Sequence, residues 1–318
     1  MPSGRQLATE TPIRVLAVIV LYKCRPDESV SVRTLCASIA HLQSVKSRIG
    51  MLLYDNSPGD LTPEGVPDGA VYAAASANDG LSGAYNYALK LAVKDGYKWL
   101  LTLDQDTTLP LDFIARLMEI LGTVERNCDI CSVVPQIVGE GRMLSPNYFL
   151  FDAIPRFYKS GFRGIAPKPT YAFNSASTLR VSALSEVGGY SPLFWLDNSD
   201  AYIYHQLNQR GKRTFVAGDI RVEHEFSMFD IRNRVNAERY QNIVNAGCAF
   251  WDLELGTLAG LYHTASLVYR IYKHWRRGDD PAIRRITFEM LKRRVFRSKK
   301  SRIAEWRRAG GRRRETFS

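Results

Sequence analysis

Apolar runs and amphipathic segments alternate along the first two thirds of the chain. Val15–Leu21 is a continuous apolar run rich in β-branched residues, and Lys98–Leu103 ends in a second such run. Runs without alternation are typical of strands that are buried on both faces of a parallel sheet. Shorter strands are predicted at Met51–Tyr54, Ala70–Ala75, Ile130–Val134 and Tyr171–Arg180.

Helical patterns lie between these strands. In the stretch 81–93, Tyr85, Ala88 and Ala92 fall on one helical face, and Gly96 then ends the helix. Other helices are predicted at Ser31–Leu42, Pro110–Leu121 and Asp200–Gln209, with a short one that ends at Val187. This alternation predicts an α/β fold with a Rossmann-like, mostly parallel central sheet flanked by helices.

The pattern changes twice in the rest of the chain. The stretch 139–168 is rich in proline, glycine and aromatic residues, and we expect a long loop there. From about Asp230 the pattern is helical to the end. The sequence therefore predicts one α/β domain in residues 1–245 and a helical, basic C-terminal extension in residues 246–318.

The positive charge of the chain is confined to its C-terminal part. The net charge is +11, but the stretch from Lys273 onward holds 17 Lys/Arg and 5 Asp/Glu, or +12, which leaves −1 for the first 272 residues. A partner that recognises positive charge would therefore bind the stretch from Lys273 onward and not the first 272 residues. We do not expect a nucleic acid in the main site.

The cysteine content and the length of the apolar runs indicate in which cellular compartment the protein is found. Five cysteines in 318 residues do not suggest a disulfide framework, and Cys128-Asp-Ile-Cys131 has no second pair to complete a zinc site. The run Val15–Leu21 is too short for a signal peptide, and no stretch reaches the roughly 18 apolar residues of a membrane span. These features favour a cytoplasmic, reducing location.

Two carboxylates follow the buried strand Lys98–Leu103. Asp104 and Asp106 are separated by one residue, and ligands of open parallel sheets bind beyond the carboxyl ends of the strands. Both carboxylates can reach Mn²⁺ or Mg²⁺, which would neutralise a diphosphate. The alternative is an ordinary strand-ending turn. His224, which follows a later strand-like segment, is a further candidate ligand as neutral imidazole.

Other polar residues follow strand ends or begin helices. Asp55 can accept a hydrogen bond from a nucleobase N–H, or it can form an Asx turn before Pro58. The segment from Asn78 to Asn86 leads into a helix, where Gly80 and Gly83 permit a ligand to approach the backbone. The alternative is an ordinary glycine-rich helix start.

Asp200 lies at the start of a predicted helix, three residues after Asp197. It is a candidate general base for an acceptor hydroxyl, although Asp is also a common helix cap. The helix dipole is expected to lower the pKa of Asp200, which keeps the carboxylate ionised but weakens it as a base.

The order of these motifs resembles that of the inverting family 2 glycosyltransferases with the GT-A fold. The ordered set is Asp55-Asn-Ser, Asn78-x-Gly-x-x-Gly83, Asp104-x-Asp106, Asn174-Ser-Ala-Ser, Gly188-Gly-Tyr, Asp197-x-x-Asp200 and His224. The likeness covers about residues 13–245. The segments Leu103–Asp106 and Leu193–Asp200 resemble most the bacterial rhamnosyltransferase-like branch.

The resemblance implies roles for individual residues. It implies that Asp200 is the catalytic base and that the metal ligands are Asp104, Asp106 and His224. It also implies nucleotide-sugar contacts from Asp55, Asn78, Gly83, Asp104, Ser175 and Asp197. The family often has Glu two residues after the base and Arg six after it, where this chain has Tyr202 and Gln206, and it usually has Ser-Gly at Ser175-Ala176. These departures affect the prediction of which sugar is transferred and which acceptor receives it.

The basic tail interleaves cations with aromatic and aliphatic residues between Tyr269 and Arg314. This composition suits an amphipathic helix on an anionic membrane surface, nonspecific binding of nucleic acid, or a solvated, partly disordered tail. Because a lipid-linked glycan is the expected acceptor, the membrane interpretation comes first. It predicts a cytoplasmic protein that is peripheral on the inner face of the cell membrane.

The sequence thus predicts an inverting, metal-dependent glycosyltransferase. The expected donor is a nucleoside diphosphate sugar, with dTDP-L-rhamnose favoured, and the expected acceptor is a hydroxyl of a glycan or lipid-linked glycan in bacterial surface polysaccharide synthesis. One alternative is a sugar-nucleotide nucleotidyltransferase, which would need a glycine-rich phosphate loop where the chain has Tyr22-Lys-Cys-Arg-Pro26. The other is a noncatalytic basic protein that binds membranes or nucleic acid.

Overall fold

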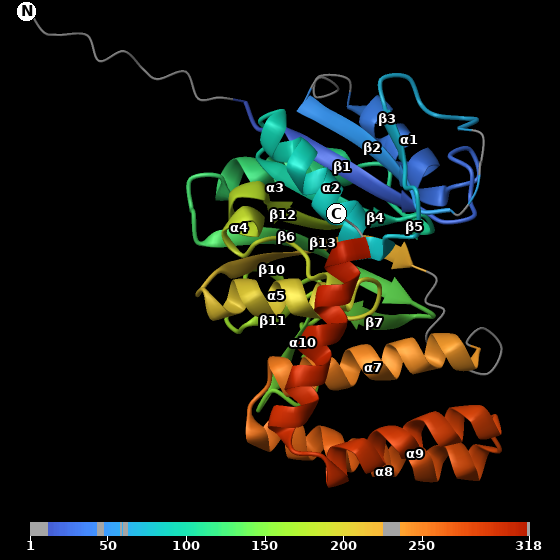
Figure 1. The fold of residues 1–318 in the computed structure, drawn as a ribbon. Coiled ribbons are helices and arrows are strands. Elements are labelled where there is room, and N and C mark those ends of the chain that lie inside the picture. Colours follow the sequence, from blue (N-terminus) through green and yellow to red (C-terminus); the bar gives the residue numbers. More distant parts are fainter. Residues whose placement is uncertain (1–11, 43–47, 58, 60–62, 225–235, 317–318) are drawn as a thin grey trace, which may run out of the picture.

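A computed structural model describes residues 12–42, 48–57, 59, 63–224 and 236–316. Its upper part is an α/β body built on one large sheet, and its lower part consists of helices (Figure 1). The sheet has the strand order β10-β13-β6-β12-β4-β1-β2-β3. Its strands are β1 (Val15–Leu21), β2 (Ile49–Asp55), β3 (Val71–Ala74), β4 (Trp99–Asp104), β6 (Ile130–Gly139), β10 (Arg163–Ile165), β12 (Ser177–Arg180) and β13 (Arg213–His224).

The strands β3, β2, β1 and β4 run parallel to one another, and β13 runs parallel to β6. The strand β12 is antiparallel to both of its neighbours, β4 and β6. Two short strands lie off this path: β5 (Thr107–Thr108) pairs with β13, and β7 (Arg142–Ser145) pairs with β6. The mostly parallel sheet predicted from the sequence is confirmed.

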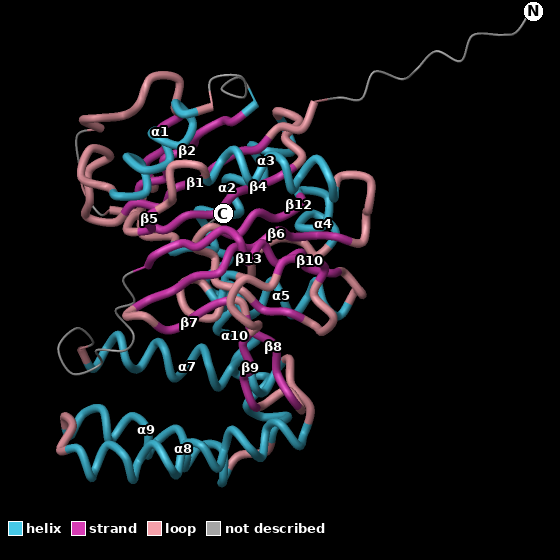
Figure 2. Tube along the Cα trace, turned by 180° about the vertical axis from the view of Figure 1, so that it is seen from behind, coloured by secondary structure: helices cyan, strands magenta, loops and turns pink. Residues whose placement is uncertain are grey.

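Helices cover both faces of the sheet (Figures 1 and 2). Alternate residues of β1 show the reason, since Val15, Ala17 and Ile19 belong to one apolar core and the residues between them belong to the other. The first core includes α1 (Val30–His41) and α3 (Phe113–Val124), and the second includes α2 (Gly80–Lys94), α4 (Val181–Glu186) and α5 (Ser199–Gln209). A strand buried on both faces needs apolar residues at every position, which explains the unbroken run.

Two local expectations were wrong. The stretch 139–168 is not a long loop, because it contains β7, β8 (Asn147–Leu150), β9 (Ile154–Phe157) and β10, and β8 pairs with β9 and β11 (Thr170–Tyr171) in a three-stranded sheet. These strands have at most four residues, too few for a periodic pattern to show. The third helix begins at Phe113 and not at Pro110, whose carbonyl accepts the Phe113 N–H in a preceding turn at 3.0 Å.

The C-terminal part is helical, as expected. It consists of α7 (Ala237–Leu253), α8 (Thr257–Arg277), α9 (Pro281–Phe296) and α10 (Lys299–Thr316). These helices share a third apolar core that also takes in Phe194 from the short 3-10 helix η2 (Pro192–Phe194). Residues 245 and 246, between which the sequence predicts the start of the extension, both lie within α7.

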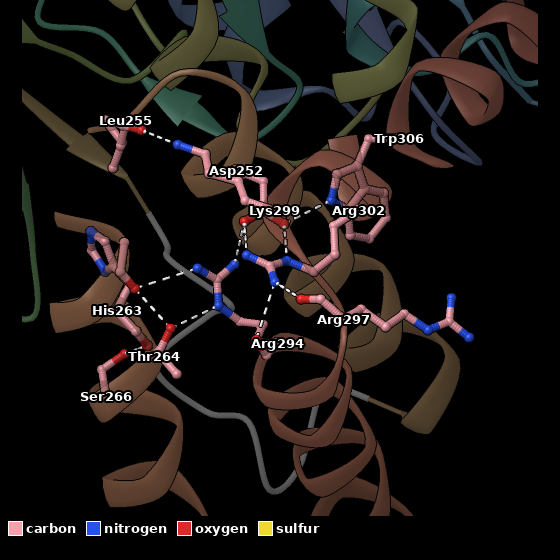
Figure 3. A network of polar contacts seen from close by, with 11 residues as sticks. Asp252, Leu255, His263, Thr264, Ser266, Arg294, Arg297, Lys299, Arg302 and Trp306 are labelled. Atoms are coloured by element: carbon pink, nitrogen blue, oxygen red, sulfur yellow. Dashed lines mark hydrogen bonds and ion pairs between the residues drawn. The ribbon is translucent and has the colours of Figure 1, made fainter. Parts of the chain in front are cut away.

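One buried carboxylate joins three of these helices (Figure 3). Asp252 on α7 accepts hydrogen bonds from Arg294 Nη1 on α9 at 2.9 Å and from Arg302 Nε on α10 at 3.0 Å. Trp306 Nε1, also on α10, donates to the same carboxylate at 3.1 Å. Burial would raise the pKa of Asp252, but these donors and positive charges outweigh it and lower the pKa. Its contribution to stability is therefore complete at neutral pH and is lost only in acid.

We expect Asp252→Asn to lower the free energy of unfolding at pH 7 by about 3–5 kcal/mol, because it leaves two buried arginines without a counter-charge. Urea denaturation of the full chain measures this loss. The matched control is Asp112→Asn, whose partner Arg116 is 42% exposed, and it should cost less than about 1 kcal/mol. Equal denaturation midpoints for the two variants would contradict the structural role of Asp252.

Candidate active site

Three parallel strands end at the same edge of the sheet. In the register of the sheet, Asp55 at the end of β2 lies opposite Leu21 of β1, and Asp104 at the end of β4 lies opposite Val20. The two aspartates therefore flank the carboxyl end of β1. In open α/β sheets this edge is where ligands bind.

Two serines at the start of α1 hold the Asp104–Asp106 segment. Ser31 Oγ accepts a hydrogen bond from Thr107 N at 2.9 Å and donates to the Asp104 carbonyl. Ser29 Oγ donates to the Gln105 carbonyl at 2.8 Å. These hydrogen bonds to backbone atoms hold the segment in place and so orient the side chains of Asp104 and Asp106. They do not involve the two carboxylate groups.

The carboxylate of Asp104 is half-buried and hydrogen-bonded. Ser175 Oγ donates to its Oδ2, and Tyr85 OH on α2 donates to its Oδ1 at 3.4 Å. Ser175 reaches this position because Ala176, the next residue, adopts a left-handed backbone with φ of 61°. Glycine takes this conformation without strain, which gives a physical reason for the Ser-Gly expected in the family pattern.

Asp200 belongs to the same electrostatic environment. Its pKa is raised to about 6, first by burial and then by the negative charges of Asp104 and Asp197, while a hydrogen bond from Ala201 N to Asp200 Oδ1 at 2.7 Å opposes the rise. The expectation of a lowered pKa was wrong, because burial and the neighbouring negative charges outweigh the hydrogen bonds from the backbone. The N-cap of α5 is Asn198 and not Asp200.

Asp197 forms an ion pair with the helical extension. Arg239 Nη1 on α7 donates to Asp197 Oδ2, and the Asp197 side chain is 9% exposed. Asp197 lines a pocket of about 130 Å³ together with Trp195 on the α/β body and Asn242 on α7. The extension thus reaches the edge of the candidate site. The expected contact of Asp197 with a nucleotide sugar stays a prediction.

Asp55 is buried and already hydrogen-bonded. Tyr72 OH on β3 donates to Asp55 Oδ2 at 2.6 Å, and Ser57 N donates to Oδ1 at 2.8 Å in the arrangement of an Asx turn. The neighbouring Asn56 ties this loop to the start of α2, where its Nδ2 donates to the Gly80 carbonyl at 3.0 Å. The turn therefore exists, and a contact with a nucleobase stays a prediction.

The glycines before and within α2 are required by packing. Gly80 has a φ of +66°, and a Cβ there would collide with the Trp195 carbonyl oxygen. A Cβ at Gly83 would collide with the side chain of Asp79. The first amides of this helix are also used within the protein, since Gly80 N donates to Asn78 Oδ1 at 3.0 Å and Ser82 N donates to the Trp195 carbonyl at 3.0 Å. No ligand contact at Asn78 or Gly83 is needed to explain why glycine occurs at positions 80 and 83.

The metal ligands expected from the sequence are brought together only in part. In the described ranges, no three His, Cys, Asp or Glu side chains are grouped to hold a metal ion. Asp106 is exposed next to Asp104, and the backbone of His224 pairs with Thr107. The side chain of His224 lies outside the described part of the structure. Two neighbouring carboxylates are hard oxygen ligands that suit Mn²⁺ or Mg²⁺ when phosphate oxygens complete the coordination.

Two tyrosines complete the surroundings of the carboxylates and were not predicted as site residues. The rings of Tyr85 and Tyr190 lie 5.0 Å apart between centroids. Burial, with the negative charges of Asp104 and Asp200, raises the pKa of both well above the ordinary value. Tyr190 OH donates to Asn174 Oδ1 at 3.2 Å. Tyr190 follows the Gly188-Gly189 break, which was the one sequence signal for it.

Comparison with known proteins identifies the fold. Residues 31–188 match the family model described as glycosyl transferase family 2. The structure of GalNAc-T7 with UDP, GalNAc and Mn²⁺ is similar with a TM-score of 0.55 and 15% sequence identity, covering 93% of this chain and 57% of that one. The chain thus spans a little over half the length of GalNAc-T7.

Residues 1–349 of TarS from S. aureus are similar with a TM-score of 0.51 and 13% identity, covering 96% of this chain and 92% of that one. The same TarS segment in complex with UDP gives a TM-score of 0.50 with the same identity and coverage. No curated protein sequence matches the chain. The chain therefore has the GT-A fold, with a helical C-terminal part.

We expect the carboxyl of Asp200 to titrate with a pKa near 6, and we expect Asp104→Asn to lower this pKa. The variant removes a neighbouring negative charge, but burial is the larger cause, so the pKa stays above 3.8, the ordinary value. Carboxyl carbon NMR of ¹³C-labelled protein measures both values. Asp112→Asn, a surface change, should leave the titration of Asp200 unchanged. A pKa near 4 in the unaltered protein would refute the electrostatic environment described for Asp200.

Proposed function

We propose that this protein is an inverting, metal-dependent glycosyltransferase that uses a nucleoside diphosphate sugar. The observation that carries the proposal is the pairing of Asp104 and Asp200 in one electrostatic environment at the carboxyl edge of a GT-A sheet. The match of residues 31–188 to glycosyl transferase family 2 supports the same reaction class.

Asp200 is the proposed general base. With a pKa of about 6, it is ionised at neutral pH and is still a stronger base than an ordinary aspartate. It takes the proton of an acceptor hydroxyl while the hydroxyl oxygen forms a bond to the anomeric carbon. The bond from that carbon to the diphosphate oxygen breaks on the opposite side, so the configuration inverts and the nucleoside diphosphate leaves.

Asp104 and Asp106, with His224, are the proposed ligands of Mn²⁺ or Mg²⁺. When bound, the ion would offset the negative charge that grows on the departing diphosphate. Ser175 and Tyr85 keep the carboxylate of Asp104 oriented toward the sheet edge. The ion would also lower the repulsion between Asp104 and Asp200, and the structure of GalNAc-T7 shows that protein with Mn²⁺ and UDP.

The proposed donor is dTDP-L-rhamnose, because the segment Leu193–Asp200 resembles the rhamnosyltransferase-like branch. Asp55 would contact the base, and the remaining donor contacts would come from Asn78, Gly83, Asp104, Ser175 and Asp197. The similar structures of GalNAc-T7 and TarS hold UDP, so a donor screen must include uridine diphosphate sugars. The proposed acceptor is a hydroxyl of a glycan or lipid-linked glycan in bacterial surface polysaccharide synthesis.

The proposed place of action is the inner face of the cell membrane, where the cytoplasmic protein is held by its basic C-terminal part. Within the described residues, the helices are too short or too polar to cross a bilayer. A lipid-linked acceptor would be reached from the membrane surface, and the partner of the helical extension would then be anionic lipid.

A screen of nucleotide sugars with Mn²⁺ and Mg²⁺ separates the proposed reaction from its alternatives. A glycosyltransferase releases the nucleoside diphosphate, and slow donor hydrolysis reveals this without an acceptor. A nucleotidyltransferase would instead exchange pyrophosphate with the nucleotide sugar. A noncatalytic protein would do neither, and failure to release diphosphate from any donor would refute the proposal.

With the donor that this screen identifies, we expect Asp200→Asn to lower the rate of sugar transfer by about 10²–10⁴-fold, because the acceptor hydroxyl loses its base. Donor affinity, measured by isothermal titration, should remain within a few-fold. Asp112→Asn serves as the control and should keep full activity. If Asp200→Asn transfers sugar at the unaltered rate, Asp200 is not the base.

We expect chelation with EDTA to abolish donor turnover and added Mn²⁺ or Mg²⁺ to restore it. Asp106→Asn should raise the concentration of metal needed for half-maximal turnover by at least about tenfold, since it removes one of few carboxylate ligands. Turnover at several metal concentrations measures the shift. Activity that persists after exhaustive chelation would show that the reaction does not need a metal.

A further inference from the structure

One face of α8 exposes large apolar side chains along its whole length. Seven of them have exposed fractions between 47% and 84%. They are Leu258, Leu261, Tyr262, Val268, Tyr269, Tyr272 and Trp275, and they are called the α8 stripe below. The opposite face of the helix holds its buried residues, Ala259, Leu267 and His274. A surface helix normally turns its apolar face inward, so α8 has a second apolar face that nothing in the described part of the chain covers.

The spacing of the stripe shows that it is one continuous surface. Successive members lie one, three or six positions apart, and Ala265, also exposed, fills the longest interval. At 100° per residue these positions fall within an arc of about 140°. The stripe therefore runs for about five turns on one side of the helix. Scattered exposed apolar residues are ordinary, but a contiguous patch of this kind marks an interaction site.

The charge around the α8 stripe indicates which kind of partner it binds. α8 contains four Lys/Arg and no Asp/Glu, and α9 contains five Lys/Arg and one Glu. Two copies of the chain that met through this hairpin would bring two strongly positive surfaces together, which electrostatics disfavours. Nucleic acid would match the charge but would leave the apolar stripe without a partner. An anionic lipid surface matches both properties.

The residue types agree with a position at the membrane surface. The stripe contains three tyrosines and one tryptophan, side chains with an apolar ring and a polar group that favour the boundary between headgroups and acyl chains. The antiparallel neighbour α9 adds exposed Phe288, Val295 and Phe296 to the same hairpin. The hairpin stands at the end of the molecule away from the large sheet (Figures 1 and 2), so a flat surface can approach it.

We infer that α8 lies in the interface of an anionic bilayer, with the α8 stripe inserted among the lipids and the basic residues of the hairpin at the headgroups. The inference rests on the proposed function, since it specifies how that enzyme meets its membrane. It places the membrane contact on α8 and not at the far C-terminal end of the basic tail. Ile283 and Trp306, two apolar residues of the basic tail, are buried within the helical core and cannot contact lipid.

The first test measures binding of the full chain to vesicles of phosphatidylcholine mixed with phosphatidylglycerol, and to vesicles of phosphatidylcholine alone. We expect binding to the anionic vesicles only. The triple variant Leu261→Ser/Tyr269→Ser/Trp275→Ser should weaken it by at least about tenfold, because it removes three apolar groups from the contact. The matched control Val93→Ser/Leu111→Ser/Phe151→Ser removes three exposed apolar groups elsewhere and should bind normally. Circular dichroism establishes that both variants fold.

The second test reports which residue enters the lipid. Brominated acyl chains should quench the fluorescence of Trp275, and Trp275→Phe should retain binding while it loses this quenching. Quenching that persists in Trp275→Phe, or equal binding of the two triple variants, overturns the inference. A mass that falls from dimer to monomer in the stripe variant would assign the stripe to a second copy instead. No assay uses a nucleotide sugar, so these outcomes are independent of the proposed reaction.

Discussion

The crowding of negative charge at the end of β4 is the constraint on which the candidate site depends. Burial first, and then the negative charges of Asp104 and Asp197, raise the pKa of Asp200. The fold tolerates this arrangement because each carboxylate has its own donor: Ser175 for Asp104, Arg239 for Asp197 and the Ala201 amide for Asp200. The three donors come from the turn before β12, from α5 and from α7. The site therefore forms only when the sheet, α5 and α7 are assembled together.

The sequence predicted the sheet well because its strands are buried on both faces and carry unbroken apolar runs. It also located the carboxylates, because Asp104 directly follows such a run and Asp200 begins a helix. It missed the small strands between residues 139 and 168, where four residues leave too short a pattern. It misjudged the pKa of Asp200, because desolvation depends on the packing around a group and not on the helix that carries it.

The ion pair between Asp197 and Arg239, and the buried tyrosines beside the carboxylates, were also beyond prediction. Arg239 is one cation among many in the chain, and nothing in its neighbours marks it. Tyr85 lies on the apolar face of α2, where a core residue and a site residue have the same pattern. Such contacts join positions that are distant in sequence, and they follow from the tertiary fold alone.

The two departures from the expected family pattern that lie on α5 have a common structural setting. Tyr202 packs on Phe194 with ring centroids 5.3 Å apart, and Gln206 Nε2 donates to Glu254 Oε2 at 3.0 Å, next to the end of α7. Both positions on α5 thus face the helical extension or the loop packed against it. Tyr202 and Gln206 are therefore both used in contacts that pack α5 against its neighbours on this side of the domain.

The helix α10 gives this architecture a fixed dimension. It begins beside the α8–α9 hairpin and runs back to the α/β body (Figure 1), where Gly310 approaches Leu193 in η2. Its 18 residues span about 27 Å. The helix thus acts as a rigid spacer that fixes the distance between the hairpin and the α/β body. In the proposed enzyme, this distance would select a membrane-anchored acceptor by its length, because the acceptor sugar must reach Asp200 at the edge of the sheet.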